Sequence, residues 1–553
     1  MMITWSEIRA RMAVIGVTLA VLILGSFRVE AADANPKKGN GQVLLGAPDF
    51  YPSSEHPVGW RGDGTGHFPG ANPPLIWSYA QGGGTNIVWQ SRMPFDSPSS
   101  VIVVGEKLFT TGNDYALICA DKRTGKILWV RPVSPFDAAT TEDRDAHKDI
   151  FDKLDSLAQK RDELLARIPG MAASVSNELS KVGAEISKND EEMMKLLSGA
   201  DRAKYRSTGM GEGGYMATTP ASDGACVYAW NGWGVTACFD LDGNRKWIRF
   251  DQLQPQEHGH YSSPLLVGDL VIVYVGRQYL ALDKRTGKEV WRTDHKAGPG
   301  EAGWWFASHV GTSIGGENVL VAGDGSLIRA LDGTRIAKGT LWHTGKGSSV
   351  VGGGFAFWME GSGGVNPKAN GSPVRYYQLP ERVDVPFTPV IKGSALEPPE
   401  GGRHVVPSVL YHDGLLYVVG NNPIFTSSGK PGLGPAMLLF VCDVLTEKIV
   451  YTRPLDFGVE PSRSDRPYGS GMAASPAMAG GKVFLIGNFG TTLILNPGRE
   501  YKEAGRNVID QRISYQYRDD RLEGTVSSPF FEGNRIYYRA QRYLYCIGEP
   551  VKP

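Results

Sequence analysis

Four histidines stand just before strand-like runs of the sequence, where their side chains could meet and do chemistry. They are His258, His260, His309 and His404. If these runs are the innermost strands of a ring of sheets, the four imidazoles converge on its axis. Converging imidazoles bind a transition metal or an anionic group. The alternative is that each histidine lies independently in a polar loop ahead of its strand.

The common catalytic signatures are missing from the rest of the chain. The sequence has no phosphate-binding loop, no dinucleotide fingerprint, no His-Glu-x-x-His and no Gly-x-Ser-x-Gly. Asp240-Leu241-Asp242-Gly243-Asn244 resembles a calcium loop but lacks the terminal Glu, so we interpret it as a turn. Arg61-Gly62-Asp63 is likewise interpreted as a Gly-rich turn. Aromatic residues at 304–306 and 355–358 are typical either of a ligand floor or of packing between sheets. We therefore assign no catalytic residue, and the sequence favours a protein that is not an enzyme.

A short repeated phrase indicates the elements that must position these side chains. Asp-x-x-Thr-Gly-Lys-x-x-Trp occurs at 121–129 and 283–291, and worn copies start at Asp240, Asp332 and Asp443. An Asp side chain can hold its own backbone in a turn, and Gly supplies the positive φ that a reversal needs. The Trp then offers a broad apolar face to the neighbouring unit. The phrase therefore predicts a hairpin that stacks on its next copy.

Stacked four-stranded units of this kind predict an all-β propeller, because one such unit cannot bury both of its faces. The predicted blade starts are 99–100, 219–220, 263–264, Thr312, a weak unit within 352–380, 406–407, 475–476 and 528–529. That count gives eight blades, or seven if the weak unit is only an excursion. A strand at 86–90 has no blade in front of it, whereas the last repeat lacks its final strand. We expect the first to complete the last and close the ring.

An insertion without strand signals follows the first repeat. From Thr141 to about Leu197, apolar residues recur every three to four positions on both sides of Pro169-Gly170. This pattern predicts an antiparallel helical hairpin, a coiled coil that stands out from the ring and serves either as a solvated decoration or as a docking arm for a protein partner. A second insertion, 361–401, is dense in Pro and Gly, and its role is not assigned.

The start of the chain is typical of an exported protein. Arg9 and Arg11 precede an apolar run, Met12 to Phe27, and small residues allow cleavage after Ala31. The predicted organisation is a signal peptide over 1–31, a flexible lead-in over 32–58, the propeller start over 59–140, the hairpin over 141–205 and the remaining blades over 206–553. The protein is then periplasmic or secreted, with no membrane span after cleavage; the alternative is anchoring by an uncleaved signal. With 58 basic and 58 acidic residues, nothing indicates nucleic acid as a partner.

The five cysteines fall at repeat positions and do not form a disulfide framework. Cys119, Cys238, Cys442 and Cys546 occupy equivalent places near the repeat Asp, which predicts small buried residues on different blades. Cys226 and Cys238 flank one turn and are the only two that are expected to come close enough to pair.

With these repeats, the Trp60-Arg61-Gly62-Asp63 opening and the signal peptide, the chain resembles the PQQ-binding-like β-propeller repeat proteins, which are WD40/YVTN-like in architecture. That superfamily includes PQQ-dependent alcohol dehydrogenases and the noncatalytic outer-membrane assembly factor BamB. In the dehydrogenases, a Trp and a disulfide of adjacent cysteines hold the quinone beside a calcium site. This sequence has no adjacent cysteines, so the resemblance disfavours PQQ with calcium here. We expect a BamB-like binding or scaffolding propeller, with a PQQ- or metal-dependent periplasmic oxidoreductase as the alternative.

Overall fold

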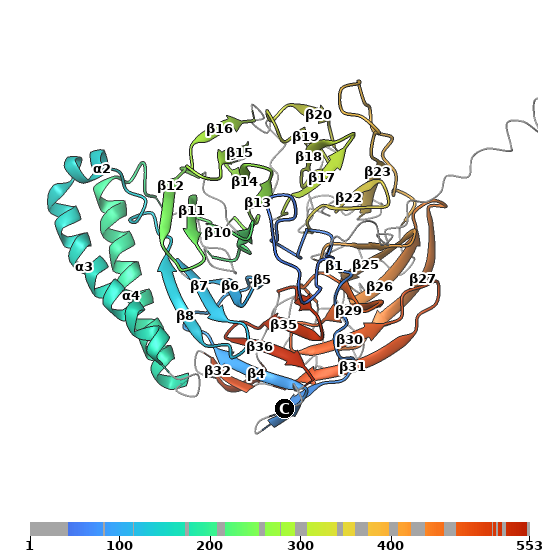
Figure 1. Ribbon diagram of the computed structural model, residues 1–553, viewed down its shortest axis with the longest axis horizontal. Helices are drawn as coiled ribbons and strands as arrows, with labels where there is room; N and C mark the ends of the chain where they lie inside the picture. Colours follow the sequence, from blue (N-terminus) through green and yellow to red (C-terminus); the bar gives the residue numbers. More distant parts are fainter. Residues whose placement is uncertain are drawn as a thin grey trace, which may run out of the picture.

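Short strands are the main secondary structure of the described residues and are arranged as a ring (Figure 1). The structure is a computed structural model. It describes residues 43–549 except 81–82, 114, 172–175, 207–215, 254–259, 277, 294–306, 340–346, 360–373, 397–406, 422–436, 458–471, 511, 516–517 and 523–526. The predicted signal peptide and its cleavage site lie outside the described residues. No helix in the described part of the chain has both the length and the apolar character of a membrane span.

The ring is built from antiparallel sheets whose strands follow one another in sequence. Blade 1 comprises β5 (Ile102–Val104), β6 (Lys107–Gly112), β7 (Ala116–Asp121) and β8 (Ile127–Pro132). Blade 2 comprises β9 (Ala221–Ser222), β10 (Cys226–Trp230), β11 (Val235–Asp240) and β12 (Arg245–Phe250). Blade 3 comprises β13 (Leu265–Val267), β14 (Leu270–Val275), β15 (Gln278–Asp283) and β16 (Glu289–Arg292), and blade 4 comprises β17 (Val310–Ile314), β18 (Glu317–Val321), β19 (Leu327–Arg329) and β20 (Arg335–Ala337).

The second half of the chain repeats this arrangement with some variation. Blade 5 comprises β21 (Val350–Gly352), β22 (Phe355–Met359) and β23 (Val374–Gln378), and blade 6 comprises β24 (Leu410–His412), β25 (Leu415–Asn421), β26 (Met437–Asp443) and β27 (Lys448–Leu455). Blade 7 comprises β28 (Ala477–Ala479), β29 (Lys482–Ile486), β30 (Thr491–Leu495) and β31 (Glu503–Ile509), and blade 8 begins with β34 (Phe530–Glu532), β35 (Arg535–Arg539) and β36 (Tyr543–Gly548). Further strands are β1 (His67–Phe68) and β2 (Ser78–Ala80) with β3 (Gly83–Thr85), which add to blade 7, and the separate hairpin β32 (Arg512–Tyr515) and β33 (Arg518–Leu522).

A closed cycle of hydrogen bonds links the first strands of these sheets. At each strand start, the backbone N–H of a buried Ser or Thr donates to the hydroxyl oxygen of its counterpart in the next sheet. The cycle runs through Thr219, Ser263, Ser308, Ser348, Ser408, Ser475, Ser528 and Ser100 and returns to Thr219, over N···O distances of 2.7 to 3.3 Å. We call these residues the hydroxyl ring. Since every sheet contributes one member, the ring favours eight blades over seven, although blade 5 has only three strands among the described residues.

In three blades, the member of the hydroxyl ring is not the residue at which the sequence predicts the blade to start. From the sequence, Thr312 is expected to open the fourth blade, whereas the ring member there is Ser308 and Thr312 is the middle residue of β17. The fifth and sixth starts are Ser348 and Ser408. The difference arises because Ser308 and Ser348 are not followed by proline, which marks the start in most other blades.

The repeat phrase has the conformation that its residues predict. Asp283 Oδ1 accepts hydrogen bonds from the Thr286 N–H and hydroxyl, and the Asp121 carboxylate does the same for Thr124. The following Trp packs on the turn of the next blade, and its indole N–H donates to a carbonyl there at 2.9 to 3.1 Å. These pairs are Trp89 with Lys122, Trp129 with Leu241, Trp247 with Lys284 and Trp291 with Ala330. The phrase therefore forms the contact between neighbouring blades.

The turn glycine in this contact is expected to be irreplaceable. Gly287 has φ +69°, and a Cβ there would lie 2.6 Å from the Trp247 ring. Gly287→Ala should cost about 2–4 kcal/mol, because left-handed strain adds to overpacking. Gly481→Ala is the matched control, since Gly481 has φ +66° with no atom within 4 Å of the added Cβ. Chemical denaturation of both variants measures the difference, and equal losses would show that indole packing is irrelevant.

The ring closes by pairing the two ends of the propeller, as the sequence predicts. β4 (Ile87–Arg92) runs antiparallel to β36, with Trp89 opposite Cys546 and Ile87 opposite Ile547. Blade 8 therefore takes its outermost strand from the start of the chain, and its sheet has the order β34, β35, β36, β4.

The helical hairpin is present but lies along the outside of the ring (Figure 1). It comprises α2 (Thr141–Ala146), α3 (Lys148–Arg167), η1 (Ile168–Gly170) and α4 (Ser176–Ala200), so Pro169 and Gly170 are at its tip. The sequence predicted that it stands out from the ring. Instead, its apolar stripe packs on β8, Arg92 donates to the Ser180 hydroxyl, and Tyr205 stacks on Phe250 at 5.4 Å between ring centroids. The hairpin therefore spans blades 8, 1 and 2.

A carboxylate clasp joins the two ends of the hairpin and should make it sensitive to acid. Asp143 accepts from Lys204 Nζ at 2.6 Å, the Tyr205 hydroxyl at 2.8 Å and the Thr140 N–H at 2.8 Å. Burial would raise the pKa of Asp143, but these donors lower it to about 2. Because this value is below that of an unfolded carboxyl, the stabilisation is present above about pH 4 and is lost as the pH falls towards 2.

Proteolysis of the segment 141–205 measures this effect. We expect cleavage within the hairpin to rise as the pH falls from 5 to 2, using a protease active over this range. Asp143→Asn should already be cleaved faster at pH 5, with a weaker dependence on pH. A wild-type hairpin that is equally resistant at every pH would contradict the clasp.

The cysteines lie where the repeat register predicts. Cys119, Cys238, Cys442 and Cys546 are buried in the third strands of their blades. All five thiols are free, and Cys226 and Cys238 on neighbouring strands are in side-chain contact. Of the predicted insertion 361–401, the described part contains β23, and Tyr376 forms a bridge with Lys392.

Candidate functional site

The segment 43–72 crosses the centre of the ring, where Figure 1 shows it as the dark blue trace. We call it the axial cap. It bonds to the inner strands of several blades: Val58 forms a bridge with Ser222 in blade 2, and β1 pairs in parallel with β28 in blade 7. The Asn72 N–H donates to the Gly533 carbonyl in blade 8. From the sequence, residues up to 58 are expected to be a flexible lead-in, whereas 43–58 lie on the ring, with Pro52 and Val58 buried.

Arg61 anchors the cap at the axis. Its side chain is buried, and its guanidinium donates to the carbonyls of Val409 and Pro476, each one residue beyond a hydroxyl-ring serine. Burial lowers the pKa of Arg61, and the Asp63 carboxylate only partly offsets this effect. Arg61-Gly62-Asp63 is therefore a turn, as predicted. The Arg61 guanidinium lies between the inner ends of blades 6 and 7.

Glycines allow the backbone of the cap to turn tightly. Arg61, Gly62, Gly64 and Gly66 all have positive φ, and a Cβ on Gly66 would lie 2.3 Å from the Arg61 guanidinium. Glycines at every second position are the sequence signal that could have indicated a tightly folded segment.

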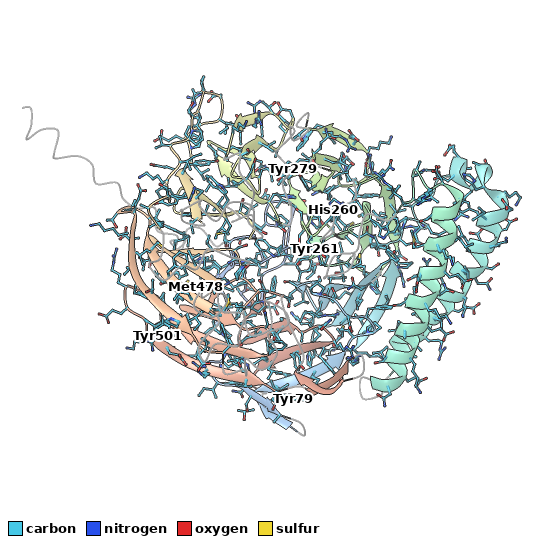
Figure 2. All side chains as sticks on the ribbon, turned by 180° about the vertical axis from the view of Figure 1, so that it is seen from behind. Tyr79, His260, Tyr261, Tyr279, Met478 and Tyr501 are labelled. Atoms are coloured by element: carbon cyan, nitrogen blue, oxygen red, sulfur yellow. The ribbon has the colours of Figure 1, made fainter. Side chains whose placement is uncertain are left out.

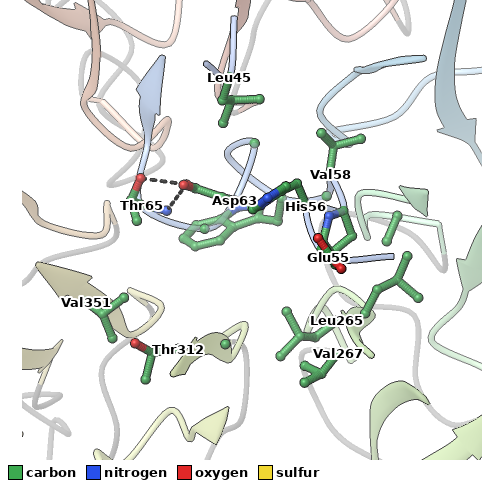
Figure 3. Close-up of a pocket in the computed structure, with 18 of the residues that line it drawn as sticks. Leu45, Glu55, His56, Val58, Asp63, Thr65, Leu265, Val267, Thr312 and Val351 are labelled. Carbon is green, nitrogen blue, oxygen red and sulfur yellow. Dashed lines mark hydrogen bonds between the residues drawn. The ribbon is translucent and has the colours of Figure 1, made fainter. Parts of the chain in front are cut away.

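A cavity of about 700 Å³ lies between the cap and the inner strands of blades 3, 4 and 5. Figure 3 shows its two walls: Leu45, Val58, Asp63 and Thr65 belong to the cap, and Leu265, Val267, Thr312 and Val351 belong to the strands. The strand residues labelled there are half-buried, so the cavity has an apolar floor that solvent reaches. Its volume is within the range of about 300–1,000 Å³ that is usual for ligand sites.

The acidic side chains that line the cavity are exposed carboxylates. Glu55 and Asp63 are exposed at its edge, and none of the described residues that line it is Lys or Arg. Asp63 Oδ1 is held in place by the Thr65 N–H at 2.9 Å and the Thr65 hydroxyl at 2.6 Å (Figure 3). Burial lowers the pKa of His309 to about 4 and that of His67 below its ordinary value, so these two of the three lining histidines do not offset the carboxylates at neutral pH.

The predicted histidine site is only partly within the described residues. His258 and His404 lie outside them, so convergence of the four imidazoles stays a prediction. His260 and Tyr261 lie on the inner side of the ring and Tyr501 on its outer side (Figure 2). His309 Nδ1 is 3.3 Å from the Ser262 hydroxyl, and Nε2 is 3.2 Å from the Ile272 carbonyl. A metal at His309 would have to replace one of these hydrogen bonds.

A metal or a quinone would need oriented donor side chains. Among them, no three His, Cys, Asp or Glu side chains converge as metal ligands. The predicted Asp240–Asn244 turn is a turn, because the Asp240 carboxylate accepts from the N–H groups of Asp242 and Asn244. Binding of PQQ with calcium, which the sequence disfavours, stays untested. The aromatic residues at 304–306 lie outside the described residues, whereas Trp358 is buried against Tyr377, at 5.5 Å between ring centroids.

Comparison with known families agrees with this architecture. The family model of the outer membrane protein assembly factor BamB matches residues 254–352, which span blade 3, blade 4 and the start of blade 5. The chain is a PQQ-like β-propeller. The ring of sheets and the inserted helical hairpin of the structure confirm the fold that the sequence predicts. No curated protein matches the sequence.

Solved propellers cover most of the chain at low identity. BamB from Moraxella catarrhalis is 10% identical, covers 86% of this chain and 99% of its own, and gives a TM-score of 0.45. The quinohemoprotein alcohol dehydrogenase from Comamonas testosteroni is 12% identical, covers 84% of this chain and 77% of its own, and also gives 0.45. The quinohemoprotein alcohol dehydrogenase ADHIIG from Pseudomonas putida HK5 is 12% identical. It covers 84% of this chain and 78% of its own, and gives a TM-score of 0.43. None of these scores reaches 0.5, so the likeness does not indicate which activity this PQQ-like propeller has.

Proposed function

We propose that this PQQ-like propeller is an exported binding or scaffolding protein that holds a partner at its axial cavity. The observation that carries the proposal is the cavity between the axial cap and blades 3, 4 and 5, with its apolar floor and exposed carboxylates. Arg61 and β1 fix the cap on blades 6 and 7, so one wall of the cavity is built into the ring. A rigid apolar cavity with a few oriented polar groups is typical of a binding site.

The N-terminal sequence supports the exported part of this proposal. Cleavage after Ala31 would release a chain that starts at Ala32, shortly before the cap begins at Val43. The hairpin is the second candidate for contact with a partner. Because its apolar stripe is buried on the ring, a partner would meet its charged outer face.

Two measurements on mature protein from its exporting host test the proposal. We expect a photo-crosslinking amino acid at position 312 to give one discrete adduct in cells, and the same residue at position 191 on the hairpin to give none. We also expect an absorption spectrum without a bound quinone after PQQ and Ca²⁺ are added. Stoichiometric quinone uptake with alcohol oxidation would overturn the proposal in favour of an oxidoreductase. An adduct only at position 191 would move the partner site to the hairpin.

A further inference from the structure

The cap covers only part of the inner circumference of the ring. In the described part of the chain it pairs with or bonds to the inner strands or turns of blades 2, 6, 7 and 8, and in blade 3 it accepts one side-chain hydrogen bond, from Lys284 to Ser54. The inner strands β13, β17 and β21 each have one described strand partner, on the side away from the axis. All three strands contribute residues to the lining of the cavity, as β9 and β24 also do through Ala221 and Tyr411. In the described part of the chain, the axial edges of β13, β17 and β21 are therefore open strand edges inside this cavity.

An open edge is a template for another strand, and the cap shows that this ring accepts such additions. β1 adds to β28 in parallel, and Val58 adds to Ser222 in the antiparallel sense. Because the inner strands are equivalent in every blade, the same main-chain pairing is available along β17, the longest of the three open strands.

The side chains around this edge determine what kind of strand fits. Residues alternate between the two faces of an added strand, so every second side chain would meet the apolar floor at Leu265, Val267 and Val351. The remaining side chains would face the edge of the cavity, where Glu55 and Asp63 are exposed. Since no described lining residue is Lys or Arg, charge complementarity favours a basic segment.

We propose that the cavity binds an extended peptide segment of a partner protein, which pairs its backbone with β17 and places Lys or Arg side chains beside Glu55 and Asp63. This inference deepens the proposed function and rests on it. The partner is recognised through main-chain pairing and charge. The segment therefore needs alternating apolar and basic residues and no particular fold of its own.

Peptide binding to the mature full-length protein tests the inference. The probe is a fluorescent peptide of the pattern Lys-Val-Thr-Val-Lys-Val, followed by fluorescence anisotropy at low and high salt. We expect it to bind at least about tenfold more tightly than the matched Glu-Val-Thr-Val-Glu-Val peptide, with the preference weakened by salt. Methylation of alternate backbone nitrogens should abolish binding, because methylated nitrogens cannot donate to a strand edge.

Variants of the protein locate the site. Glu55→Lys should reverse the charge preference and Thr312→Arg should block binding, whereas the control Glu191→Lys on the hairpin should change nothing. Circular dichroism and thermal unfolding of each variant confirm that the ring is folded, and Asp63→Asn provides a second, milder test of the charge. Lys-peptide binding that survives both Glu55→Lys and Thr312→Arg would overturn the inference.

The outcomes separate this inference from the function on which it rests. A discrete crosslink at position 312 without any preference for the Lys peptide would retain a binding propeller and overturn the extended basic peptide as its partner. Peptide binding that appears only after residues 32–42 are removed would show that this segment of the chain occupies the cavity. That result would also overturn the inference.

Discussion

Arg161→Met is expected to lower the free energy of unfolding by about 3–5 kcal/mol, the usual effect of removing one partner of a buried ion pair. Arg161 and Asp137 form two hydrogen bonds, of 2.8 and 3.0 Å, and both side chains are buried where α3 meets blade 1. Without the guanidinium, Asp137 would keep only the N–H and hydroxyl of Ser134. Urea denaturation measures the loss, and hydrogen exchange over 148–200 shows whether the hairpin detaches.

The pH dependence and a double variant test the same explanation. Burial would raise the pKa of Asp137, but Arg161 holds it below its ordinary value, so the pair stabilises the fold at neutral pH and less as the pH falls. In Arg161→Met the carboxyl loses that partner, and the stability curves of variant and wild type should converge in acid. Asp137→Leu combined with Arg161→Met should recover part of the loss, since it removes the unpaired Asp137 carboxylate. A double variant no more stable than Arg161→Met would contradict this account.

Trp89→Ala is expected to cost about 2–4 kcal/mol and to open the ring at its seam. Trp89 lies on β4, its indole N–H donates to the Lys122 carbonyl at 3.1 Å, and a Cβ on Gly125 would lie 2.5 Å from its ring. Its removal weakens the hold of blade 1 on the strand that joins the two ends of the propeller. Hydrogen exchange should therefore rise at residues 87–92 and 543–547 before the rest of the ring unfolds.

Trp291→Ala is the matched control, because Trp291 makes the same contact with Ala330 and Gly333 between blades 3 and 4. It should cost a similar free energy, yet leave exchange at 87–92 and 543–547 unchanged, since no chain end lies at that contact. Equal opening of the seam in both variants would show that loss of stability, and not the position of Trp89, governs closure.

Patterns of residues close together in the sequence predicted most of the fold and little of the candidate site. The Asp turn and the stacked Trp could be predicted because each follows from residues adjacent in sequence, and the hairpin from its apolar period. The axial cap could not, because Arg61 meets Val409 and Pro476 only after the ring has closed. The same holds for the side on which the hairpin packs, which depends on Arg161 reaching Asp137. The cavity formed by the cap is therefore a product of long-range contacts.

Pairing of β4 with β36 also sets an order of events during synthesis. Ile87 leaves the ribosome long before its partner Ile547, because the strands of seven other blades lie between them in the sequence. Until then β4 has no place in a sheet, and its exposed edge is a potential site of wrong pairing. Such a distant contact closes slowly, since the whole intervening chain must be organised before its ends meet. Folding of this protein should therefore include a late step in which β4 and β36 join.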